Sequence, residues 1–205
     1  MNLQKIYEET DNCFNCKLSK LQCNILDSNN SIYGKLLINH CVQNPGKIKL
    51  LLIGIAPSYR RFDNQRRAFE GILHNSIKES KNSGDFFYYV LDKSKLKEFD
   101  IYITNLIKCS TESNSEPEEE SVLACKRLLE LEISIIKPHY IISMGNFVKF
   151  WLSKMKLDIE VINTKHPSFY FRFKSQQAVE DELKEFDSIA MRINSKTSIL
   201  NKWLE

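Results

Sequence analysis

The chain has 205 residues, a formal net charge of +3 and 42% hydrophobic residues. This length and apolar content suffice for one globular domain with a full core, which excludes an intrinsically disordered chain. No apolar run approaches the ~20 residues needed to cross a bilayer, and residues 1–10 lack the apolar middle of a signal peptide. We therefore expect a single domain over residues 1–205 in the cytoplasm, where its six cysteines stay reduced.

Strand and helix patterns alternate along the chain. The run IKLLLIGI at 48–55 is typical of a buried parallel strand. The alternation predicts an α/β fold, a three-layer α/β/α sandwich around a central, mainly parallel four-stranded sheet. Further strands are expected at 100–107, 139–145 and 158–164, helices at 2–9, 71–80, 118–136, 146–155 and 176–193, and loop and edge structure at 24–47.

Three polar segments follow the predicted strands. They are GIAPS at 54–58, TNLIKC at 104–109 and TKHPS at 164–168. Because the active cleft of a parallel sheet opens at the carboxyl ends of its strands, these segments are the first candidates for a functional site.

Four cysteines have a spacing that suits a metal centre. Cys13 and Cys16 form a C-x2-C pair, and Cys109 and Cys125 lie sixteen residues apart. Four thiolates can hold a [4Fe-4S] cluster or a zinc ion. The wide second pair is unlike a zinc ribbon and favours the cluster. We interpret the other two cysteines, at positions 23 and 41, as free thiols.

These segments and cysteines together resemble the uracil-DNA glycosylase superfamily, and most of all its iron-sulfur, family-four branch. GIAPS stands for the GEAPG of that branch, AFEG at 68–71 for PFVG, TNLIKC for TNxxKC, and HPS at 166–168 for its late HPS or HPA, all in family order. The resemblance implies a uracil-DNA glycosylase-like fold and a monomer that acts on DNA. It also implies a [4Fe-4S] cluster on Cys13, Cys16, Cys109 and Cys125, which ties residues 1–25 to the core.

The resemblance assigns roles to four residues. A glycosylase must flip its nucleotide out of the duplex. Phe69 would stack on the flipped base, Asn105 would read its pyrimidine edge, and His166 would stabilise the charge on the leaving base. Asp63 is the only carboxylate between Ser58 and Phe69, and is the candidate for activating water. Each residue also has a purely structural alternative. Phe69 would be a core residue and Asn105 a strand-end cap. His166 would be a structural histidine and Asp63 a loop residue.

Basic and aromatic residues predict where DNA is contacted. The segment FYFRFK follows HPS, and Phe169 and Tyr170 are candidates for a wedge that enters the base stack. Arginines before AFEG suit a phosphate backbone or a bulky polar base. Ordinary packing and a solvated loop are the open alternatives. The candidate DNA contacts are Arg60, Arg61, Ser168, Phe169, Tyr170 and Arg172.

The first two motifs depart from the family pattern. Ile55 replaces the glutamate of GEAPG, and Ala56 cannot act as the asparagine or aspartate of other branches. Ser58 replaces the last glycine, and Glu70 replaces the valine beside the stacking residue. Small Ala56 and Ser58 leave space where some uracil-specific relatives place a bulky tyrosine. The four residues are base-binding candidates for uracil or a modified pyrimidine, including hypermodified cytosines of phage genomes.

Three functions are therefore compared. The first is a monofunctional DNA glycosylase that leaves an abasic site, in repair or in anti-phage defence. The second is a non-catalytic DNA-binding relative that has lost the water-activating carboxylate. The third is an electron-transfer protein built around the cluster. We favour the first because the motifs occur together and in family order.

Overall fold

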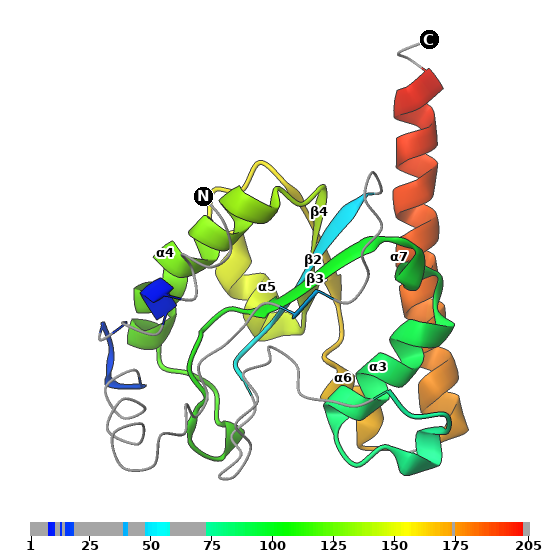
Figure 1. Ribbon diagram of the computed structural model, residues 1–205, viewed down its shortest axis with the longest axis horizontal. Coiled ribbons are helices and arrows are strands. Elements are labelled where there is room, and N and C mark those ends of the chain that lie inside the picture. The colour runs from blue at the N-terminus through cyan, green and yellow to red at the C-terminus, as the bar shows by residue number, and fades with distance from the viewer. Residues whose placement is uncertain are drawn as a thin grey trace. The chain divides into compact units, whose positions relative to one another are not determined.

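The structure is a computed structural model that describes residues 8–10, 13, 15–18, 39–40, 48–57, 73–173 and 175–202. The chain divides into two compact units, each described by itself, and Figure 1 shows their elements. The first unit comprises Met1–Glu70 and Asp100–Asn163, and the second comprises Gly71–Phe99 and Thr164–Glu205. The single domain over 1–205 stays a prediction.

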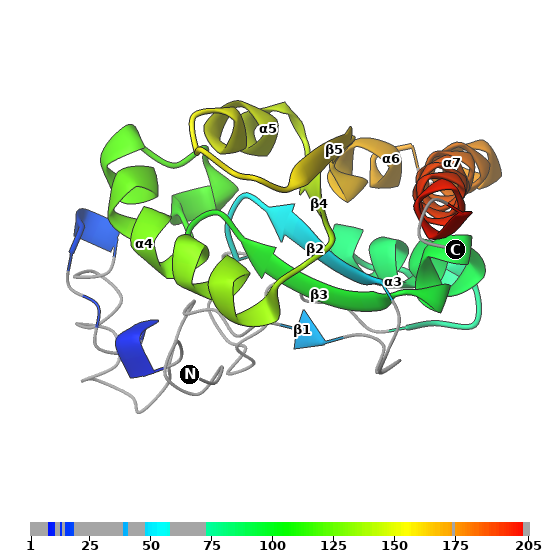
Figure 2. The ribbon, with the colours of Figure 1, turned by 90° about the horizontal axis from the view of Figure 1, so that it is seen from above.

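The described strands form one five-stranded sheet in the order β1-β3-β2-β4-β5 (Figure 2). The central strand β2 (Lys49–Gly54) pairs in parallel with β3 (Asp100–Asn105) and with β4 (Tyr140–Met144). At one edge β1 (Asn39–His40) is antiparallel to β3, and β5 (Glu160–Thr164) forms the other edge. The predicted α/β fold with a mainly parallel sheet is confirmed, and β1 is a strand beyond the four expected.

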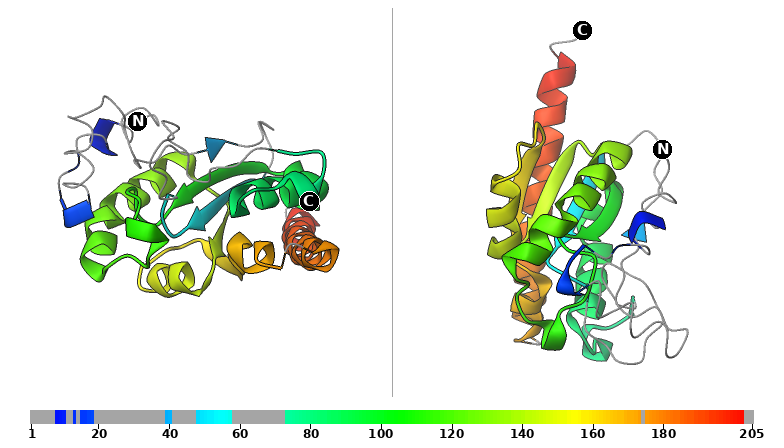
Figure 3. Two further views of the ribbon diagram at one scale, coloured as in Figure 1. Left: turned by 90° about the horizontal axis from the view of Figure 1, so that it is seen from below. Right: turned by 90° about the vertical axis from the view of Figure 1, so that its left-hand side faces the viewer.

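Both faces of the central strand are covered. Leu51 and Ile53 of β2 belong to a buried apolar cluster that includes residues of α4 (Glu119–Ile136) and α5 (Asn146–Ser153). Figure 3 shows these two helices with the sheet. The alternate residues Leu50 and Leu52 are equally buried. An unbroken apolar run is therefore what this strand requires.

Backbone chemistry sets the end of α4 and the start of α5. Lys137 follows α4 with a left-handed φ of 51°, and its N–H donates to the carbonyl of Ile133 at 2.9 Å. Pro138 cannot continue the helix. Gly145 turns the chain from β4 into α5 with a φ of 100°, which glycine adopts without a steric penalty.

The described helices of the second unit are α3 (Ser83–Lys93), α6 (Pro167–Phe171) and α7 (Gln176–Lys202), with a short 3-10 helix η2 (Lys95–Glu98). Aromatic edge-to-face contacts join them. The rings of Phe87 and Phe186 are 6.0 Å apart, and those of Phe86 and Phe171 are 6.2 Å apart. Among the described residues, no helix combines the length and apolar character needed to cross a membrane.

The predicted helix at 71–80 is wrong. Its described part contains only a 3-10 turn, η1 (Ile77–Glu79), and the helix of this region is α3. It starts at Ser83 because the side chain of Asn82 accepts the N–H of Asp85 at 2.9 Å. The last helix, α7, begins as predicted but continues past position 193 to Lys202. Of the predicted helix at 2–9, only residues 8 and 9 are described, and both are helical.

Candidate functional site

Two of the predicted site segments meet at the end of the sheet in the first unit. Gly54 is the register partner of Asn105, so β2 and β3 end level. Beyond them, the N–H groups of Leu106 and Ile107 donate to the carbonyls of Gly54 and Ile55 at 2.8 and 3.1 Å. The structure thus brings the described residues 54–57 of GIAPS beside TNLIKC at a carboxyl edge, where ligands of parallel sheets bind.

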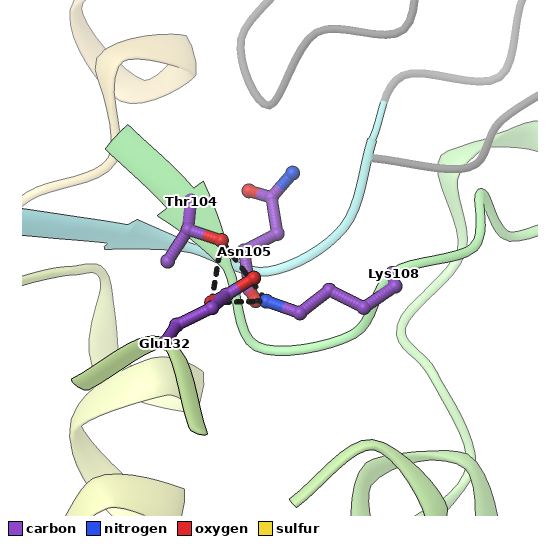
Figure 4. A network of polar contacts seen from close by, with 4 residues as sticks. All are labelled: Thr104, Asn105, Lys108 and Glu132. Atoms are coloured by element: carbon purple, nitrogen blue, oxygen red, sulfur yellow. Dashed lines mark hydrogen bonds and ion pairs between the residues drawn. The ribbon is translucent and has the colours of Figure 1, made fainter. Parts of the chain in front are cut away.

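Asn105 ends β3 and is completely buried. Figure 4 shows its side-chain amide directed away from Lys108 and Glu132, while its backbone carbonyl faces Lys108. An amide carries a donor and an acceptor together, which complements the edge of a pyrimidine. Ile55 and Ala56, the described base-binding candidates, follow β2 and are both half-buried.

Beside Asn105 lies a buried ion pair (Figure 4). The ammonium of Lys108 donates to Glu132 Oε2 at 2.6 Å, to Thr104 Oγ1 at 2.9 Å and to the Asn105 carbonyl at 2.7 Å. The Thr104 hydroxyl in turn donates to Glu132 Oε2 at 2.9 Å. Burial raises the pKa of the Glu132 carboxyl, and Lys108 and Thr104 partly oppose this rise. All three donors of the ammonium are therefore used inside the protein.

The four predicted metal ligands all belong to the first unit. Cys16, Cys109 and Cys125 are buried, Cys13 is half-buried, and none forms a disulfide. Burial raises the pKa of the Cys125 thiol to about 11. A backbone hydrogen bond and the charge of Lys108 oppose this rise, and the charges of Cys16 and Cys13 add to it. Cys125 therefore lies within electrostatic reach of the C-x2-C pair.

The four cysteine thiols suit an iron-sulfur cluster as ligands, although the described residues do not form a coordination sphere. Four thiols without disulfides are the ligands that iron-sulfur clusters use. A buried thiol with a pKa near 11 needs a nearby cation to become a thiolate ligand. Across the described residues, no three His, Cys, Asp or Glu side chains converge on a metal position. An ion pair between Arg127 and Glu9 at 2.8 Å joins the N-terminal segment to α4 two residues beyond Cys125.

His166 lies in the second unit as the N-cap of α6. Its Nδ1 accepts the backbone N–H of Ser168 at 3.2 Å and lies 2.8 Å from the Ser168 hydroxyl. A backbone N–H only donates, so Nδ1 carries no proton and the neutral ring carries its proton on Nε2. Burial lowers the pKa of His166 to about 4. At neutral pH the ring is therefore an uncharged Nε2–H donor. Ser168, predicted to contact DNA, thus contacts His166.

The aromatic residues after HPS divide into buried and exposed ones. Tyr170 is 5% exposed, and its hydroxyl donates to Glu185 Oε2 at 2.6 Å. Phe169 is 36% exposed and Phe173 is 62% exposed. Of the two predicted wedge residues, Phe169 therefore faces solvent and Tyr170 does not, and Phe173 is an exposed aromatic that the prediction missed.

Two cations lie on the exposed Phe169 ring. The ammonium of Lys165 is 4.7 Å from the centroid of the Phe169 ring, and the guanidinium carbon of Arg172 is 5.6 Å from it. These distances are those of cation–π contacts. We name Lys165, Phe169, Arg172 and Phe173 the aromatic–basic surface. It has the composition that binds the bases and phosphates of DNA.

Six predicted site residues lie outside the described residues, and their roles stay predictions. They are Ser58, Arg60, Arg61, Asp63, Phe69 and Glu70.

Sequence reasoning also missed two buried glutamates on the helices. Glu132 falls in the buried row of α4 between Leu129 and Ile133, and Glu182 falls in that of α7. A carboxylate in an apolar helical row is the signal that could have found both, because a buried charge needs a partner. Glu132 has Lys108. Neither side-chain oxygen of Glu182 has a hydrogen-bond partner within the described part of the chain.

Comparison with known proteins shows the family of the chain. The family model of the uracil DNA glycosylase superfamily matches residues 42–189. The chain is 29% identical over 170 residues to a type-4 uracil-DNA glycosylase of Saccharolobus solfataricus, covering 82% of this chain and 68% of the relative. The corresponding protein of Sulfurisphaera tokodaii is 26% identical over 184 residues, covering 87% and 71%. That of Pyrobaculum aerophilum is 30% identical over 147 residues, covering 71% and 61%.

The α/β sheet, the polar segments at its carboxyl edge and the family match define the class, and the chain belongs to the uracil DNA glycosylase superfamily. The protein is a DNA glycosylase, and its relatives place it with the iron-sulfur, family-four branch that the motifs predicted.

Proposed function

We propose that the protein excises uracil from DNA by hydrolysing the N-glycosidic bond, and that neutral His166 stabilises the leaving base. The supporting observation is the His166 ring itself, with Nδ1 occupied by the Ser168 N–H and a pKa lowered to about 4 by burial. The relatives named above are type-4 uracil-DNA glycosylases.

The reaction breaks the bond between the sugar C1′ and N1 of the base. The bonding electrons leave with N1 of uracil, which departs as an anion whose charge is delocalised onto a carbonyl oxygen. The Nε2–H of His166 donates a hydrogen bond to that oxygen, and a donor aimed at developing charge is usually worth ~10²–10³ in rate. Water adds to C1′ and gives its proton to a base, for which Asp63 is the proposed acceptor.

Asn105 is proposed to select the base. Its position at the end of β3 fixes the backbone, and its buried amide offers a donor and an acceptor to one pyrimidine edge. A site built to hydrogen-bond an edge strongly rejects an analogue that leaves its groups unpaired. Phe69 is proposed to stack on the same base.

A modified pyrimidine is the second candidate substrate. Ala56 lies just after β2, beside the TNLIKC segment, and its small side chain leaves room for a substituent. Hypermodified cytosines, removed in defence against phage, fall in this class.

A [4Fe-4S] cluster is proposed on Cys13, Cys16, Cys109 and Cys125. Three of these thiols are buried, and the charges of the C-x2-C pair add to the raised pKa of Cys125. Bound there, a cluster would cross-link the N-terminal segment, the turn after β3 and helix α4, a structural role rather than one in the hydrolysis.

The test is a panel of single- and double-stranded oligonucleotides carrying uracil, hydroxymethylcytosine or glucosylated cytosine. Alkali after incubation cleaves abasic sites, and mass spectrometry identifies the free base. We expect release of uracil. Release only from a modified strand would select the second candidate. Binding without cleavage of any strand would contradict the proposal.

A further inference from the structure

The buried ion pair of Lys108 and Glu132 has no role in the chemistry proposed above. Its side chains are each 2% exposed, and no atom of either is needed to break the glycosidic bond. Buried ion pairs seldom add to stability, because desolvation of the two charges offsets their attraction. A pair kept in this position therefore calls for another explanation.

The contacts of the ammonium give that explanation. Lys108 lies three residues after Asn105 and bonds back to its carbonyl at 2.7 Å, which closes the turn that follows β3. Glu132 and Thr104 hold the ammonium from two further sides, at 2.6 and 2.9 Å. The Lys108 ammonium thereby bonds the turn both to helix α4 and to the last residues of β3.

The same turn carries a predicted metal ligand. Cys109 follows Lys108 directly, and the Lys108 backbone is hydrogen-bonded to Cys125 on α4. The N–H groups of Leu106 and Ile107, within the turn, are bonded to the end of β2. Movement of Lys108 would thus shift the base-reading residue and the neighbouring cysteines together.

We propose that Lys108 and Glu132 are positioning residues that hold the Asn105–Cys109 turn in the geometry needed to read the base. This inference rests on the proposed role of Asn105. Neither residue touches the substrate, and both act through the backbone of the turn. A misplacement of about 1 Å at such a turn can lower kcat roughly a hundredfold.

The experiment replaces the pair by apolar residues of similar size, in Lys108→Met/Glu132→Leu. Single Lys108→Met leaves a buried carboxylate unpaired and is expected to unfold at a lower temperature, whereas the double variant should melt near the parent. The control is Lys126→Met/Glu130→Leu, which removes an exposed pair, 3.6 Å apart, on the same helix.

Two readouts are measured: kcat and KM on a uracil strand, and hydrogen exchange of the Leu106 and Ile107 amides. We expect the double variant to lose roughly a hundredfold in kcat with little change in KM, and its two amides to exchange faster. The control should match the parent. If the double variant does not fold, Glu132→Gln takes its place, with a smaller loss of kcat and the same faster exchange.

A folded double variant with parental kcat and parental exchange would overturn the inference. So would a control that loses as much as the double variant. A parent that releases no uracil would instead refute the proposed function, and the exchange of the two amides would still decide whether the pair holds the turn.

Discussion

The backbone N–H of Ser168 donates to Nδ1 of His166, and this bond fixes which ring nitrogen carries the proton. Nδ1 of the imidazole accepts this hydrogen bond, so protonation of Nδ1 would break it. Protonation would also place a positive charge on a partly buried ring. The two effects act in one direction, and burial already lowers the pKa of His166 to about 4.

The pH dependence of kcat follows from this bond. We expect kcat to show no acid limb near pH 6.5 that belongs to His166, because the ring stays neutral down to about pH 4. The measurement is the single-turnover rate constant of base release between pH 5 and 8 at constant ionic strength. An acid limb near pH 6.5 that disappears in His166→Ala would show that the pKa of His166 is not lowered. A fall in kcat as the pH rises through 6.5 would show that the imidazolium is the working form.

His166 also contributes to the pH dependence of folding. Its folded pKa of about 4 lies below its ordinary value of 6.5, so between these values the unfolded chain binds more protons. The stability linked to His166 is therefore present above pH 6.5 and is lost as the pH falls toward 4. Denaturant unfolding of the parent and His166→Ala should diverge over that window and run parallel above it.

Glu182 should act in the opposite direction. Burial, and secondarily the charge of Glu185, raise the pKa of Glu182 from 4.5 to about 8. Between these values the folded chain holds the extra proton, so stability falls as the pH rises through the window. We expect Glu182→Gln to melt higher than the parent at pH 8 and similarly at pH 5.

Glu180 is the matched control, since it is exposed on the same helix. Glu180→Gln should leave the melting temperature unchanged at both pH values. A Glu182→Gln variant that is less stable than the parent at pH 8 would mean that the ionised carboxylate has a partner in the folded protein.

The aromatic–basic surface predicts how DNA is held. Phe173 is the most exposed ring of this surface, and stacking of a base on an aromatic side chain is worth ~1–3 kcal/mol. Phe173→Ala should therefore raise KM for DNA about tenfold, with a smaller effect on kcat. Fluorescence anisotropy with a labelled oligonucleotide gives the same comparison without turnover.

Met191 supplies the control for that surface. It is 55% exposed on α7, and Met191→Ala removes a comparable apolar side chain. Tyr170→Phe removes the hydroxyl that binds Glu185 and should cost about 1 kcal/mol of stability without weakening DNA binding. Equal binding by the parent and Phe173→Ala would exclude Phe173 as a DNA contact.

The four ligand cysteines should share one phenotype. Cys125→Ala is expected to lose iron and visible absorbance. It should also melt at a lower temperature, because the free energy of metal binding no longer adds to the stability of the fold. Cys23→Ser should retain full iron, since Cys23 is predicted to be a free thiol. Zinc in place of iron in the purified parent would refute the cluster and leave the ligand set intact.

The sheet was predictable because its strands carry their own signal. IKLLLIGI is apolar on both faces, and β2 is buried on both. The start of α3 was not predicted, because it depends on a capping bond from Asn82 rather than on an apolar pattern. The end of α7 was missed for a similar reason, since the helix continues beyond its apolar row.

The residues of the candidate site also divide into those that the sequence predicted and those that it did not. Motif order predicts Asn105, His166 and the four cysteines as site residues, and their roles stay predictions. No local pattern links Lys108 to Glu132, which lie 24 residues apart. Nor does a local pattern decide that Tyr170 is buried while Phe169 is exposed. Such choices are made by packing between elements, which one segment of sequence does not contain.

Asn105 and His166 are proposed to serve the removal of a pyrimidine base. The most direct test is the free base released by the parent, Asn105→Ala and His166→Ala from a uracil-containing strand, measured by mass spectrometry. We predict uracil from the parent and a loss of roughly 10²–10³ in rate for each variant, with iron content unchanged. Parental rates in both variants would contradict this proposal.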